Sequence, residues 1–135
     1  MKIFTQIIFL IIISALTACS SIETQNEYTR QFDFASIMTY KISKESGSLY
    51  YDEIKEAVNT AMAHKGMGIN VENYDFIIDW NLQSDGSLNI EIYNPRTMDI
   101  VWRGWTKEIV TEASIPDAVQ TIFKDFPPAA IAVFP

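Results

Sequence analysis

Two acidic residues, Asp79 and Glu91, have the spacing that most readily suggests chemistry. They fall on two expected strands joined by a hairpin, whose register places them directly opposite each other on one sheet face. Opposed like charges destabilise a sheet, so the pair could bind a cation or act as acid and base. The simpler interpretation is that Arg103, which the next hairpin can place opposite Asn89 and diagonal to Glu91, compensates the charge. We favour it, because calcium usually takes about six or more oxygens.

The other side chains give no support for an active site. His64, the only histidine, ends an expected helix, where the helix dipole favours a cation, and no partner exists to complete a zinc site. The chain has no Gly-x-Ser-x-Gly motif, no phosphate loop and no dinucleotide fingerprint. We therefore expect a protein that is not an enzyme and needs no cofactor. The alternative is an acid-residue enzyme or a cation-binding domain that uses Asp79 and Glu91.

Cys19, the only cysteine, lies where an apolar leader meets a polar stretch. Lys2 and the apolar run 3–16 resemble a secretory signal, and the run is shorter than the ~20 residues of a membrane-spanning helix. Residues 16–19, Leu-Thr-Ala-Cys, resemble the lipobox of bacterial lipoproteins, whose cysteine sulfur accepts diacylglycerol. We expect a signal peptide over 1–18 that is cleaved before a lipidated Cys19. The alternative is an ordinary cleaved signal with an incidental cysteine.

The charge of the chain argues against some classes of partner. It carries 10 basic and 17 acidic residues, and cleavage before Cys19 removes only Lys2, which leaves a formal charge of −8. Nucleic acid and anionic headgroups are drawn to basic patches, so we expect neither as a partner. Ser20, in place of aspartate after the cysteine, resembles the enterobacterial signal for the outer membrane. We expect a protein anchored there by lipid and facing the periplasm.

Hydrophobic periodicity predicts one α+β domain behind a polar tether. The lipidated cysteine and tether take residues 19–31, and the domain takes 32–135. Alternating apolar residues predict strands, and helical spacing predicts helices at 49–65 and from Ser114 onwards. The expected strands are 38–42, 74–82, 88–92 and 99–110. The expected fold is a mainly antiparallel sheet with two α-helices packed on one face.

The turn between the second and third expected strands sets their register. Residues 84–86, Ser-Asp-Gly, suit a three-residue loop with glycine in the left-handed conformation. That loop places Leu82 opposite Leu88, whereas a two-residue loop would oppose Leu82 to Asn89. The apolar pattern therefore selects the three-residue loop.

The sheet face that the helices leave free is the predicted partner surface. Apolar and aromatic residues gather there beside an arginine, and partly exposed patches of this kind often mark binding sites. The residues are Ile77, Tyr93, Val101, Arg103 and Trp105. The alternative is that Phe32, the tether or the apolar tail 129–135 folds across this face.

Several short motifs, taken in order, resemble a known family. They are Asp33-Phe34 with Thr39-Tyr40, Lys65-Gly66, Asp75-Phe76-Ile77-Ile78, Gly86-Ser87-Leu88-Asn89-Ile90, Val101-Trp102-Arg103-Gly104 and Phe126-Pro127-Pro128. From Tyr28 to Pro128 the chain is similar to the bacterial envelope lipoproteins of domain-of-unknown-function family 4136. It departs from them in a tight turn where many members carry an insertion, and in Met67 where an aromatic commonly follows the glycine. The resemblance implies a lipid-anchored envelope domain and transfers no catalytic residue.

These observations predict a non-enzymatic lipoprotein of the bacterial envelope. Lipid on Cys19 attaches it to the membrane, and the sheet domain binds a periplasmic protein or another envelope component, or supports envelope assembly.

Overall fold

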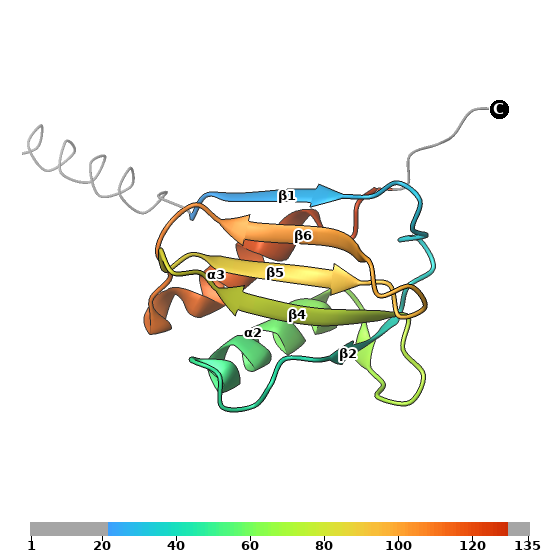
Figure 1. Ribbon diagram of the computed structural model, residues 1–135, viewed down its shortest axis with the longest axis horizontal. Coiled ribbons are helices and arrows are strands. Elements are labelled where there is room, and N and C mark those ends of the chain that lie inside the picture. The colour runs from blue at the N-terminus through green and yellow to red at the C-terminus, as the bar shows by residue number, and fades with distance from the viewer. Residues whose placement is uncertain (1–21, 130–135) are drawn as a thin grey trace, which may run out of the picture.

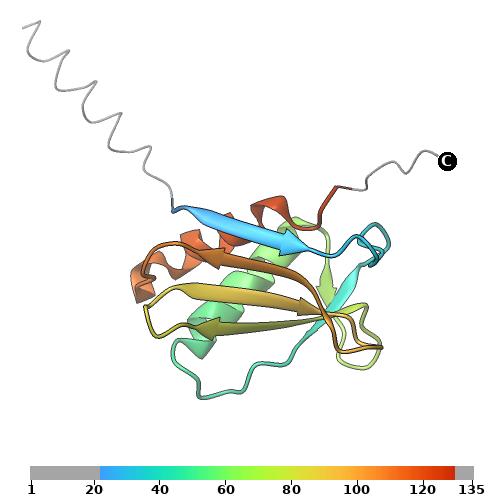
Figure 2. The same ribbon diagram turned by 45° about the horizontal axis from the view of Figure 1, so that its top comes forward.

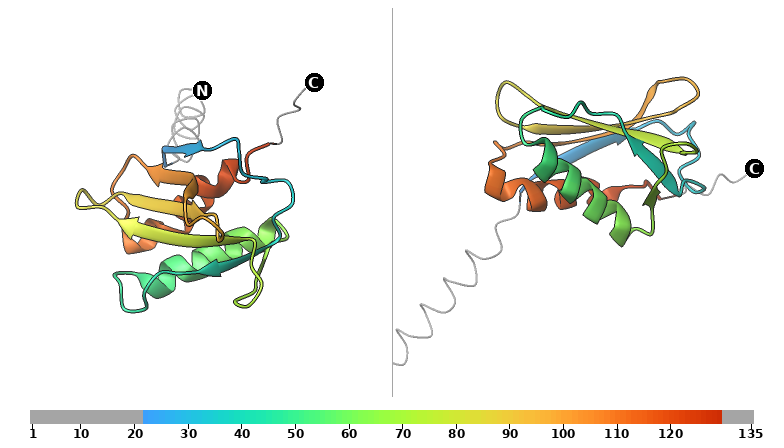
Figure 3. Two further views of the ribbon diagram at one scale, coloured as in Figure 1. Left: turned by 45° about the vertical axis from the view of Figure 1, so that its right-hand side comes forward. Right: turned by 90° about the horizontal axis from the view of Figure 1, so that it is seen from below.

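The computed structural model describes residues 22–129 and shows one six-stranded sheet with two helices on one face (Figures 1 and 3). The strands are β1 (Thr24–Tyr28), β2 (Thr39–Ile42), β3 (Gly68–Ile69), β4 (Phe76–Leu82), β5 (Leu88–Tyr93) and β6 (Ile100–Thr106). The helices are α2 (Tyr51–His64) and α3 (Ile115–Ile122), with short 3-10 turns η1 (Glu112–Ser114) and η2 (Phe123–Asp125) on either side of α3. The predicted α+β fold is confirmed.

The sheet has the strand order β1-β6-β5-β4-β2-β3. The first four strands in this order pair antiparallel, whereas β2 runs parallel to both β4 and β3. These strands are parallel because helix α2 follows β2 and returns the chain to the end of the sheet at which β2 itself begins, where β3 and β4 also begin. The sheet is therefore mixed, and its centre is the β4–β5–β6 meander.

The β4–β5 hairpin has the predicted three-residue loop. Leu82 pairs with Leu88 and Trp80 pairs with Ile90. Gly86 adopts φ +87°, and its N–H donates to the carbonyl of Gln83 over 2.9 Å. The left-handed glycine closes this turn at no steric cost, as expected from the sequence.

Both helices bury the apolar stripes that identified them. In α2, Ile54, Val58 and Met62 have no exposed surface. The helix ends in a Schellman motif, in which Met67 N–H donates to Met62 O over 3.0 Å beyond Gly66 at φ +75°. The second stripe runs through α3 and η2 and consists of Ile115, Val119, Ile122, Phe123 and Phe126, all buried. Both stripes face the sheet, so the core is a single layer.

The tether predicted over 19–31 is wrong for its central part, because residues 24–28 form strand β1. This strand pairs antiparallel with β6 along one edge of the sheet (Figure 2). Its sequence, Thr-Gln-Asn-Glu-Tyr, is polar because an edge strand is held by backbone hydrogen bonds and most of its side chains stay exposed. The domain therefore starts by Ile22, which packs against the core, instead of at residue 32.

The predicted register of the next hairpin is also wrong. Arg103 pairs with Glu91 instead of lying opposite Asn89, whose partner is Trp105. The turn after β5 extends to Met98, which adopts φ +60°, and Asn94 N–H donates to Asp99 O across it over 2.9 Å. A bulge in β6 then places Ile100 opposite Tyr93. The register moves by two residues, so the side chains of the regular part of β6 keep their predicted faces.

Gly104 is the point in β6 where a side chain would not fit. A methyl group there would lie 2.7 Å from Cγ2 of Ile122 and closer still to Cη2 of Trp102. The Trp102 ring stacks on Phe123 with centroids 5.7 Å apart, so the indole lies between the sheet and the last turns of the C-terminal helix. Close packing of α3 against β6 therefore depends on the absence of a Cβ at position 104.

We predict that Gly104→Ala lowers the free energy of unfolding by about 1–3 kcal/mol, because overpacking forces Trp102 and Ile122 apart. Denaturant unfolding measures the loss. Gly68→Ala is the matched control, since a methyl group there meets nothing within 4 Å, and we expect a change under about 0.5 kcal/mol. Equal effects of the two substitutions would contradict this account of the core.

Candidate functional site

The outer face is the sheet surface turned away from α2 and α3 (Figure 3). Strand alternation places there the side chains that flank the buried ones on each strand. It consists of Gln25 and Glu27 on β1, Lys41 on β2, Ile77, Asp79 and Asn81 on β4, Asn89, Glu91 and Tyr93 on β5, and Arg103 and Trp105 on β6. Five strands thus contribute to one surface that combines charged and aromatic groups.

The two acidic residues lie opposite each other as predicted, and Asp79 pairs with Glu91 in the ladder. Each carboxylate is bound within its own strand. Asp79 accepts a hydrogen bond from the N–H of Trp80 over 2.8 Å, and Glu91 accepts one from Nδ2 of Asn89 over 2.7 Å. Within residues 22–129, no three histidine, cysteine, aspartate or glutamate residues lie together in a way that could hold a metal ion.

Tyr93 completes the hydrogen bonding of Glu91. Its hydroxyl donates to Oε2, while Asn89 donates to Oε1, so both carboxylate oxygens have a partner. This hydrogen bond, together with burial and the nearby charges of Glu91 and Asp79, raises the pKa of Tyr93 to about 12. The hydroxyl therefore remains a hydrogen-bond donor to Glu91 throughout the physiological pH range.

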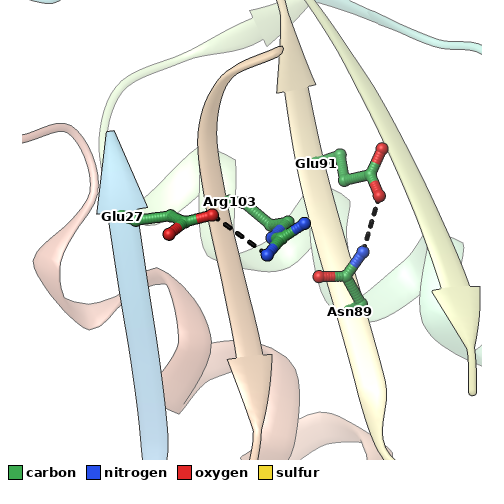
Figure 4. Close-up of polar contacts among 4 residues, drawn as sticks. All are labelled: Glu27, Asn89, Glu91 and Arg103. Atoms are coloured by element: carbon green, nitrogen blue, oxygen red, sulfur yellow. Dashed lines mark hydrogen bonds and ion pairs between the residues drawn. The ribbon is translucent and has the colours of Figure 1, made fainter. Parts of the chain in front are cut away.

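Arg103 does not compensate Glu91 in the way predicted, although the two residues are paired in the ladder. Its guanidinium forms an ion pair with Oε1 of Glu27 on β1, at 3.0 Å (Figure 4). The cation also lies 5.2 Å from the centroid of the Trp105 ring, within the range of a cation–π contact. Glu27 can reach Arg103 because residues 24–28 form strand β1, next to β6, and not a tether.

The Glu27–Arg103 pair is exposed enough that it adds little to stability. Surface ion pairs of this kind typically contribute ~0–1 kcal/mol because water screens them. Nε of Arg103 is nevertheless shielded from water and has no hydrogen-bond partner among the residues that the structure describes. The arginine thus keeps a donor that no described residue uses.

Two members of the predicted partner surface are buried. Ile77 is 5% exposed and Val101 is 4% exposed, so neither offers much area to a partner. Ile77 lies between its cross-strand neighbours Lys41 and Tyr93, whose long side chains flank it on both sides. Val101 lies at the β6 bulge and belongs to the core cluster. Tyr93, Arg103 and Trp105 remain, each half-buried.

Three segments were predicted as alternatives that could fold across the outer face: Phe32, the tether and the tail 129–135. Phe32 and the tether do not lie over it. Phe32 makes an edge contact with Phe34, with centroids 4.9 Å apart, and Phe34 contacts Phe126 on the helix side of the sheet. The supposed tether extends the edge of the sheet as β1. The third cover, the tail 129–135, lies outside the described residues except for Ala129.

Sequence reasoning missed a hollow beside Asp79. The loop 43–48 encloses an open space of about 520 Å³ next to this carboxylate, and Nζ of Lys44 donates to Asn81 over 3.1 Å. A run of small polar residues gave no signal beyond a loop. His64 lies exposed in the last turn of α2, as expected, and lines neither this hollow nor the smaller groove between α2 and α3.

Comparison with known proteins shows a shared fold. No protein-family model and no curated protein matches the chain. A crystal structure of a PDZ domain protein from Parabacteroides distasonis matches with a TM-score of 0.65 and 10% identity, over 80% of this chain and 36% of that one. This chain therefore spans about a third of that protein. The PelC dodecamer from Paraburkholderia phytofirmans gives a TM-score of 0.46 at 7% identity, over 75% of this chain and 94% of that one.

Proposed function

We propose that the protein is a non-enzymatic lipoprotein of the bacterial envelope, held to the outer membrane by lipid on Cys19. Its outer face binds another component of the envelope, on the periplasmic side. The observation that carries the binding part is the grouping of Tyr93, Arg103 and Trp105 on a sheet face that neither helix covers.

The lipid anchor is supported by the sequence alone. Leu-Thr-Ala-Cys ends an apolar leader at Cys19, and Ser20 favours the outer membrane. Membership of domain-of-unknown-function family 4136 belongs to the same proposal, on the motifs between Tyr28 and Pro128. Within residues 22–129, the structure has no helix of sufficient length and apolarity to cross a bilayer.

The composition of the outer face suits a macromolecular partner. Tyrosine, tryptophan and arginine are the residues most enriched at binding hot spots. Because Ile77 and Val101 are buried, contact falls to the aromatic rings and to charged groups. The Arg103 guanidinium, part-exposed beside the Trp105 ring, supplies the positive charge of this surface. These features fit a polar protein surface better than an apolar small molecule.

The alternative, chemistry at Asp79 and Glu91, has less support. Both oxygens of Glu91 accept hydrogen bonds from neighbours on the same strand, and Asp79 accepts one from the backbone. A general base needs a lone pair directed at its substrate, and both oxygens of Glu91 already accept hydrogen bonds that hold Asn89 and Tyr93 in place. We therefore retain binding as the function.

The anchor is tested by Cys19→Ala. We predict that the variant folds, lacks the lipid and is released from the membrane fraction, because several acyl chains are needed for durable attachment. Mass spectrometry of the N-terminal peptide and fractionation after a salt wash measure both effects. A variant that stays with the membrane after the wash would show that something other than this lipid holds the protein.

The partner surface is tested by the double substitution Tyr93→Ala and Trp105→Ala. A photo-crosslinking residue at Gln25, an exposed position paired with Trp105 across the β1–β6 ladder, should trap a discrete adduct in intact cells, and this adduct should disappear in the double variant. We expect the free energy of unfolding to fall by no more than about 1.5 kcal/mol per site, because both rings lie outside the core and Tyr93→Ala also removes the hydrogen bond to Glu91.

The control for this experiment is Leu49→Ala, which removes an exposed apolar side chain just before α2 and should leave the adduct intact. If the double variant unfolds at a markedly lower denaturant concentration than the parent, Tyr93 and Trp105 belong to a second core. The proposed surface would then be withdrawn.

A further inference from the structure

The chain between Cys19 and the folded domain is very short. Ile22 already packs against the core, and the carbonyl of Glu23 accepts a hydrogen bond from Lys107 N–H over 3.0 Å. The Glu23 carboxylate also lies 3.9 Å from Nζ of Lys107. Only Ser20 and Ser21 separate the anchored cysteine from these contacts. At full extension, three residue steps span about 11 Å, so a lipid on Cys19 keeps this part of the domain near the bilayer.

One end of the sheet is therefore the proximal end, defined here by the loops 83–87 and 107–111. Strand β1 begins at this end, β4 and β6 finish there, and β5 starts from it (Figure 1). The two loops are joined, since Val110 N–H donates to Gly86 O over 2.9 Å. The β5–β6 turn, with Met98, lies at the opposite end.

Ile109 is the most exposed large apolar residue among those that the structure describes, at 73%. It belongs to the loop 107–111, two residues after the contact of Lys107 with Glu23. Its side chain rests on Gly86, where a methyl group would lie 2.9 Å from its Cγ2. The glycine therefore supports the isoleucine from one side and leaves the rest of it uncovered at the end nearest to the lipid.

We propose that the proximal end rests on the phospholipid surface and that Ile109 enters the interfacial layer of the bilayer. This inference rests on the proposed lipid anchor at Cys19. Asp85 and Glu108 lie on the same two loops, so the contact suits neutral, zwitterionic headgroups and stays shallow.

The orientation has a consequence for the rest of the domain. Strands of seven residues carry the β5–β6 turn roughly 20 Å away from the proximal loops. The outer face then stands beside the membrane surface, with Tyr93 towards the far end and Trp105 towards the bilayer. A partner can approach it from the side.

The test uses fluorescent labels at two positions of the mature, lipidated protein. The sulfur of Cys19 carries the lipid, so Ile109→Cys and Met98→Cys each supply the only free thiol. Both positions are exposed, so neither change disturbs the core. Each variant carries a polarity-sensitive fluorophore and is reconstituted into phosphatidylcholine vesicles that contain a nitroxide quencher on the acyl chain. We expect severalfold stronger quenching and a blue-shifted emission at position 109 compared with position 98.

A spacer variant checks that the short connection causes this contact. About 12 glycine and serine residues inserted between Ser21 and Ile22 form a flexible coil and should reduce quenching at position 109 to the level at 98. Equal quenching at the two positions, in protein that carries the lipid and floats with vesicles, would overturn the inference and leave the anchor standing. Protein without lipid that does not float would overturn both.

Discussion

The backbone pairing of β1 with β6 is the interaction on which the rest of this structure depends. It places Glu27 next to Arg103, and the guanidinium of Arg103 forms its ion pair with Glu27 instead of Glu91. It also aligns Tyr28 with Trp102, beside the aromatic layer that joins the sheet to the C-terminal helix. Finally, it starts the fold at Thr24, a few positions after Cys19 in the sequence.

The aromatic layer beneath β6 explains why this edge is well held. Trp102 stacks on Phe123 and makes an edge contact with Phe126, and Phe126 in turn contacts Phe34 and Phe76. Aromatic contacts of this kind contribute ~0.5–1.5 kcal/mol each beyond the area that they bury. They join strands β4 and β6, the segment after β1 and the residues that follow α3 in one cluster.

The parts of the fold that follow from local periodicity were predictable from the sequence. Helix α2 and the β4–β5 hairpin belong to this group. The spacing of apolar residues identifies the helix, and Gly86 with the alternating apolar residues sets the hairpin register. Strand β1 was not predictable, because Gln25, Asn26 and Glu27 carry no apolar pattern and the strand exists only through its pairing with β6.

The candidate site was predictable in its faces and not in its contacts. Asp79 and Glu91 lie opposite each other because the hairpin register demands it. Arg103 lies opposite Glu91 in the ladder because Met98 adopts a left-handed backbone conformation, which is rare for residues other than glycine, and because β6 has a bulge near Val101. The burial of Ile77, between its cross-strand neighbours Lys41 and Tyr93, likewise depends on the three-dimensional arrangement.

Amide hydrogen exchange along β1 tests most directly whether this segment is a strand or a tether. The hydrogen bonds of Lys107 N to Glu23 O and of Thr29 N to Val101 O mark the two ends of the ladder, so alternate amides between them point towards β6. The amides of Gln25, Glu27 and Thr29 should exchange slowly, and those of Asn26 and Tyr28 quickly. Exchange of all five at the rate of an unstructured peptide would contradict the account.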